Sequence, residues 1–131
     1  MVDWLDKLDW GSEQQSDLRA LGFDFIRQGH YERATIYYEA LVALDPHSLY
    51  DLHTLGGLYV QLGDGERAMR YLERALELDP NCVPALINKA NALVVAGAQQ
   101  DALTVAGKLT QLDDPAARRL GEALQLAYTN I

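Results

Sequence analysis

Apolar residues recur at steps of three and four along most of the chain, which is the spacing of amphipathic helices. One stretch carries Leu18, Leu21 and Phe25, and the same steps continue in later stretches up to Leu124. No stretch shows the alternation with a period of two that a half-buried strand requires. The pattern therefore predicts an all-α fold.

Several residue types repeat at an interval of 34 positions. The repeated residues are Gly29, Gly63 and Gly97; Ala34, Ala68 and Ala102; and Leu-Asp-Pro at 44–46 and 78–80, with an echo one residue late at 112–115. Proline cannot continue a helix, the Asp before it can cap the next one, and glycine accepts the left-handed conformation that ends a helix. Each period therefore predicts a helix, a glycine turn, a second helix and an Asp-Pro break, giving repeats at about 15–48, 49–82 and 83–114.

This organisation resembles the tetratricopeptide repeat, a helix–turn–helix unit of 34 residues. The matching signature positions are Leu18, Leu21, Gly22, Phe25, Ala34, Tyr38, Leu41 and Pro46 in the first unit, and Leu52, Leu55, Gly56, Tyr59, Ala68, Leu72, Ala75 and Pro80 in the second. The third unit departs from the pattern, with Lys89 where an apolar residue is usual and Asp114 where proline is expected. The resemblance implies an α-solenoid of three helix–turn–helix repeats whose first helices line a concave face.

Two segments flank the repeats. Residues 115–128 have a helical pattern, with Asp114 able to cap its start and Pro115 suited to its first position, so we expect a C-terminal capping helix that completes a domain spanning 15–131.

Residues 1–14 form a short N-terminal helical segment in our prediction. Its apolar residues are Trp4, Leu5, Leu8 and Trp10, and Asp residues lie between them. Such a short segment has no core of its own. Two alternatives stay open: the segment packs on its own solenoid, or it is buried against another chain, in a homodimer or with another partner.

The composition narrows the classes of partner. The chain has 131 residues, enough for one domain, and a formal net charge of −8. This charge disfavours nucleic acid and anionic membrane surfaces. One cysteine, Cys82, permits no intrachain disulfide, and neither a secretory leader nor an apolar run of about 20 residues occurs, so we expect no membrane insertion and a cytoplasmic location.

Candidate chemistry is sparse. The histidines His30, His47 and His53 lack the spacing of metal ligands, and no base is paired with Cys82 in the sequence. The glycines lie at turns and form no phosphate-binding loop. The sequence predicts neither an enzyme nor a site for a metal or cofactor.

The resemblance instead implies a peptide-binding groove along the first helices. Its positions correspond to Arg19, Phe23, Ile26 and Arg27 in the first unit, to Tyr50, His53, Gly57, Val60 and Gln61 in the second, and to Ile87, Asn88, Asn91, Val94 and Val95 in the third. The alternative is that Phe23, Tyr50, Ile26 and Val60 pack between helices. Some members of the family grip a C-terminal carboxylate with a Lys/Asn/Arg clamp, but Phe23, Gly57 and Thr54 stand where its asparagines would be sought. An extended peptide held by side-chain anchors fits better.

The first unit, LRALGFDFIRQGHYERATIYYEALVALDP at residues 18–46, is also similar to class II chaperones of bacterial type III secretion. The shared feature is a glycine turn followed by Tyr-Glu-x-Ala. This resemblance implies a chaperone that holds an aggregation-prone translocator or needle-type subunit, alone or with another small chaperone. The alternative function is a general scaffold or adaptor that assembles a folded complex.

Overall fold

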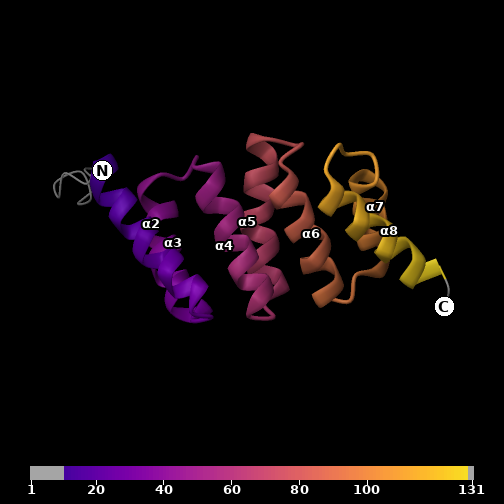
Figure 1. The fold of residues 1–131 in the computed structure, drawn as a ribbon, viewed down its shortest axis with the longest axis horizontal. Coiled ribbons are helices and arrows are strands. Elements are labelled where there is room, and N and C mark those ends of the chain that lie inside the picture. The colour runs from indigo at the N-terminus through magenta and orange to yellow at the C-terminus, as the bar shows by residue number, and fades with distance from the viewer. Residues whose placement is uncertain (1–10, 130–131) are drawn as a thin grey trace.

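The computed structural model describes residues 11–129, which form seven helices (Figure 1). They are α2 (Ser12–Arg27), α3 (Tyr31–Leu44), α4 (Leu49–Gln61), α5 (Gly65–Leu78), α6 (Val83–Val95), α7 (Gln99–Leu109) and α8 (Pro115–Thr129). The prediction of an all-α solenoid with three helix pairs and a terminal helix is confirmed. None of the described helices is long and apolar enough to span a membrane.

The first-to-second helix turns use the three predicted glycines. Gly29, Gly63 and Gly97 have φ values of 78°, 77° and 73°. This left-handed conformation strains residues that carry a Cβ atom, whereas glycine adopts it freely. The 34-residue spacing of these glycines therefore sets where each helix pair turns back on itself.

The turns between repeats differ from the prediction. Asp45 does not cap α4; the N-cap residue is Ser48, and the Asp45 carboxylate instead accepts the backbone N–H of His47 within the turn. Asp79 likewise precedes Cys82, the N-cap residue of α6. The predicted caps were wrong because the turn takes four residues, which places each Asp three residues before the cap.

The helix ends near the termini of the domain follow local chemistry. α2 begins at Ser12, three residues before the predicted start of the first repeat, and Gly11 is its N-cap residue. At α8 the prediction is confirmed, since the Asp114 carboxylate accepts the backbone N–H of Ala117 at 2.8 Å and Pro115 is the first helical residue.

Small residues set how closely the two helices of a repeat approach. Ala34, Ala68 and Ala102 are fully buried. A Cβ atom on Gly22 would lie 2.8 Å from the Tyr38 ring, and one on Gly56 would lie 2.5 Å from Leu72. The helix pairs therefore need small side chains at these crossings.

The stack curves with the first helices inside. α4 contacts α6 directly, α6 contacts α8, and Arg19 of α2 bonds to Asp51 of α4, so neighbouring first helices lie side by side. Within residues 11–129, no two of the second helices α3, α5 and α7 contact each other as extensively as α4 contacts α6. Because the first helices approach one another more closely, their shared surface is the concave side, which we call the inner face.

Candidate functional site

Large apolar side chains stand exposed on the inner face. Phe23 on α2 is 48% exposed, Tyr50 on α4 is 46% exposed, and Val94 and Val95 are exposed at the end of α6. By contrast, Ile26, Val60 and Ile87 are half-buried and pack against the core. The two aromatic residues therefore do not pack away between helices, whereas the aliphatic residues of the predicted set partly do.

A part-buried ion pair joins the first two helices of the inner face. Arg19 on α2 donates from Nε and Nη2 to the two carboxylate oxygens of Asp51 on α4, at 2.8 and 2.7 Å. Asp51 is fully buried, and its hydrogen bonds raise the pKa of the Arg19 guanidinium further. The guanidinium also lies 6.0 Å from the centre of the Tyr50 ring. Arg19 is therefore a contact between repeats.

Asp51 is the inner-face residue that sequence reasoning missed. It lies in the first turn of α4, where an exposed acidic residue is common because it interacts favourably with the helix dipole. Its burial depends on Arg19, which is 32 positions earlier in the chain. A single sequence carries no local signal for such a pair.

An amide joins the second and third helices of the inner face. The Asn88 side chain donates to the backbone oxygen of His53 at 3.2 Å. A Cβ atom on Gly57 would lie 2.8 Å from the same amide nitrogen. Gly57 thus leaves the room that Asn88 needs to reach across α4, and Asn88 also acts as a contact between repeats.

His53 is held neutral by its surroundings. Burial lowers the pKa of the imidazole, and the nearby Asp51 carboxylate opposes that shift. The ring meets Tyr50 edge to face, with 5.4 Å between centroids. His53 therefore supports the Tyr50 ring and adds no positive charge to the inner face near neutral pH.

Arg27 is the other predicted arginine of the inner face. It is bound to Asp24 at 2.6 Å and lies 5.8 Å from the centre of the Phe23 ring. Both predicted arginines therefore already face a carboxylate of this chain, and the exposed aromatic rings lie beside them. Of the other predicted residues, Gln61 is exposed and Asn91 is half-buried.

A polar cluster on the other side of α4 serves the stack. The Glu39 carboxylate on α3 accepts hydrogen bonds from the hydroxyls of Tyr59 on α4 and Tyr71 on α5. Burial and these bonds raise the pKa of Tyr59 to about 12 and raise that of Tyr71. Three helices from two repeats are thereby joined.

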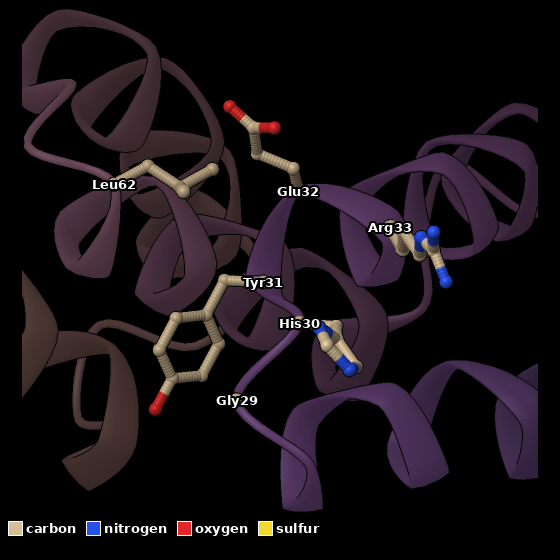
Figure 2. A pocket seen from close by; sticks show the side chains of 6 residues that line it. All are labelled: Gly29, His30, Tyr31, Glu32, Arg33 and Leu62. Carbon is tan, nitrogen blue, oxygen red and sulfur yellow. The ribbon is translucent and has the colours of Figure 1, made fainter.

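A hollow at the Gly29 turn offers no convergent chemistry. It lies between the start of α3 and the end of α4, with His30, Tyr31, Glu32 and Leu62 in its wall (Figure 2). Figure 2 shows the Tyr31 ring and the Glu32 carboxylate pointing in opposite directions. In residues 11–129 no group of three His, Cys, Asp or Glu residues is arranged to hold a metal. The predicted contacts Trp4, Leu5, Leu8 and Trp10 lie outside the described residues.

Comparison with known proteins agrees with this geometry. A family model described as tetratricopeptide repeat matches residues 21–125. No curated protein matches the sequence.

Solved structures with the same fold have low sequence identity. The Yersinia enterocolitica type III secretion chaperone SycD in complex with a peptide of the translocator YopD is 20% identical, with a TM-score of 0.77 over 90% of this chain and 97% of that one. PcrH in complex with the chaperone-binding region of PopD is 20% identical, with a TM-score of 0.75 over 92% of each chain. The first repeat domain of Spaghetti (RPAP3) bound to an HSP90 peptide is 16% identical, with a TM-score of 0.79 over 91% of this chain and 96% of that one.

Proposed function

The chain belongs to the tetratricopeptide repeat family, and from this premise we propose that it binds an extended, mainly apolar segment of a protein client along its inner face. The observation that carries the proposal is the pair of half-exposed aromatic rings, Phe23 and Tyr50, on neighbouring first helices. Exposed apolar groups gathered in a concave surface are typical of partner sites. Rings of this kind act as anchors for a peptide held in an extended conformation.

The charges of the inner face favour an apolar segment over an acidic one. Arg19 is held by the fully buried Asp51 carboxylate, and Arg27 pairs with Asp24 at the surface, so both guanidinium groups already have a counter-ion within the chain. The chain as a whole carries a formal charge of −8, which repels acidic ligands at long range. Phe23, Gly57 and Thr54 also supply no amide at the positions of the carboxylate clamp.

The client class that we propose is a translocator or needle-type subunit of a type III secretion system, bound in the cytoplasm. Among the similar structures, SycD holds a peptide of the translocator YopD and PcrH holds the chaperone-binding region of PopD. The Tyr-Glu-x-Ala motif at Tyr31 supports the same class. The chemistry needed is masking of apolar surface by reversible contacts. The inner face supplies such contacts without any reactive group.

A binding experiment tests the proposal. Labelled synthetic peptides that tile the proteins encoded beside this gene are titrated with the full chain, and fluorescence anisotropy gives the dissociation constants. We expect an apolar peptide to bind. Phe23→Ala and Tyr50→Ala should each weaken binding by about 30-fold, since loss of a well-packed anchor costs about 2 kcal/mol, and the double variant should weaken it further. Leu78→Ala is the matched control, because Leu78 is similarly exposed but lies on a second helix.

Three outcomes would contradict the proposal. Equal affinity in the double variant and the control would remove the inner face as the binding site. Tight, salt-sensitive binding of a peptide that ends in acidic residues would overturn the apolar client. Co-purification with an intact folded complex, without binding of any isolated peptide, would favour the adaptor function instead.

A further inference from the structure

In the third repeat, one face of the helix pair packs on the preceding repeat. Lys89 on α6 forms an ion pair with Glu73 on α5 at 3.1 Å. Leu93 on α6 and Thr104 on α7 line the same hollow as Met69 of α5. We call this the leading face of a repeat, because it meets the second helix of the repeat before it.

The second repeat uses its leading face in the same way. Leu55 on α4 is fully buried, and the Tyr71 hydroxyl on α5 donates to Glu39 on α3. The Arg74 guanidinium lies at the backbone oxygen of Pro46, just after α3. The second and third repeats thus use equivalent positions, 34 residues apart, to pack against the second helix of the repeat before them.

The first repeat has a leading face that no described helix covers. Subtracting the 34-residue period places on it Leu18, Leu21, Phe25, Arg33, Ile36, Tyr37 and Ala40. Leu21 is 49% exposed and Ile36 is 67% exposed, and no helix precedes α2 within residues 11–129.

This face is more apolar than its counterparts at the positions nearest solvent. Ile36 corresponds to Arg70 in the second repeat and to Thr104 in the third, both of which are exposed. Ala40 corresponds to Arg74, which is partly exposed. A repeat that ended the stack in water would carry polar residues here, as the ends of solenoids do. Even the two covered repeats keep polar residues at these positions, so the first repeat exposes apolar surface that they do not expose, and such surface at the end of a solenoid calls for a cover.

We propose that residues 1–10 of the same chain cover the leading face of the first repeat, as the second helix of a preceding repeat would. In the 34-residue register, residues 1–10 correspond to 35–44, which belong to α3. The segment carries apolar Met1, Trp4, Leu5 and Leu8 at helical spacing, so a helix over this segment would place them on one side.

The length and the charge of residues 1–10 favour this segment as the cover of the leading face. A ten-residue helix is about 15 Å long, which matches the distance along α2 from its start to the level of Leu21. The Asp residues of the segment complement Arg33 on the face, whose guanidinium is exposed. Attachment at Gly11 keeps the segment at a high effective concentration beside the face. The proposal stands independently of the client that the inner face binds.

Tryptophan fluorescence provides a direct test, because both tryptophans of the chain, Trp4 and Trp10, lie in this segment. The measurement is acrylamide quenching of the full chain. We expect protected tryptophans in the wild type and a several-fold rise in the quenching constant for Ile36→Asp, which places a negative charge against the Asp residues of the segment. Leu126→Asp on α8 is the matched control, since Leu126 is 65% exposed at the opposite end of the stack.

The oligomeric state and a second variant complete the test. Sedimentation should give a monomer whose quenching constant does not change on dilution, and Leu21→Asp should act like Ile36→Asp with an unchanged circular dichroism spectrum. Tryptophans that are fully accessible in the wild type, or equally protected in both variants, would overturn the proposal. Protection that disappears on dilution, together with a dimer mass, would assign the face to a second copy and also overturn it.

Discussion

The Arg19–Asp51 pair provides the sharpest test of how the repeats are held together. Asp51 is fully buried, and both of its carboxylate oxygens accept hydrogen bonds from one guanidinium. Arg19→Ala would leave the carboxylate buried without its counter-ion. The partner change, Asp51→Asn, removes the negative charge but keeps the shape of the side chain.

The expected costs differ because the two side chains differ in exposure. Breaking a buried pair by removing one partner costs about 3–5 kcal/mol. The Arg19 side chain is 32% exposed, so water can reach part of the space it leaves, and we expect Arg19→Ala to cost about 3 kcal/mol, at the lower end. Asp51→Asn strands a guanidinium that can turn toward water, so we expect about 1–2 kcal/mol. The double variant should cost less than the sum, because its two sites no longer interact.

Urea unfolding followed by far-ultraviolet circular dichroism measures these free energies. Against a total stability of about 5–15 kcal/mol for a domain, a loss of about 3 kcal/mol is readily resolved. A cost below about 1 kcal/mol for Arg19→Ala would show that the pair behaves like a surface ion pair and would refute the reasoning. Strict additivity in the double variant would refute it as well.

Three further predictions concern Ala68, His53 and Glu39, which are buried or half-buried. Ala68→Glu should lower the free energy of unfolding by more than about 4 kcal/mol and abolish the cooperative thermal transition, because a charge enters a fully buried helix crossing. Ala43→Glu, at an exposed site, is the control, and a native-like melt of Ala68→Glu would disprove the crossing. Burial lowers the pKa of His53 below its ordinary 6.5, so the unfolded chain binds the proton more readily. The free energy of unfolding should therefore fall as the pH drops below 6.5. Urea titrations should show that His53→Gln removes this part of the fall. Identical pH profiles of the wild type and His53→Gln would exclude the effect. Glu39→Ala should cost about 2 kcal/mol in the same assay, since two tyrosine hydroxyls lose their acceptor, and an unchanged midpoint would contradict this.

Much of the fold could be predicted because its determinants are local and periodic. Gly29 and its two equivalents each end a helix by a conformation that glycine alone adopts easily, so their spacing revealed the repeat. Asp114 and Pro115 start α8 by contacts within one turn. Asp45 and Asp79 gave the wrong caps because the same side chain can accept from a turn or from a helix start, and only the length of the turn decides between them.

The candidate site was less predictable because its chemistry depends on contacts across the stack. The position of Arg19 on α2 placed it on the inner face, but its bond to Asp51 exists only once α2 and α4 pack together. Asn88 likewise uses its amide to reach α4 across Gly57. Phe23 is half-exposed on α2, and its place on that helix follows from the register of one helix alone.

Chemical-shift mapping by nuclear magnetic resonance tests the central claim most directly. The isotope-labelled chain is titrated with the apolar peptide that binds most tightly in the anisotropy screen. The account predicts that the largest shift changes follow the inner face, at Phe23, Tyr50 and Val94, while the outer sides of α3, α5 and α7 change little. Largest changes on those second helices, with the inner face unaffected, would contradict it.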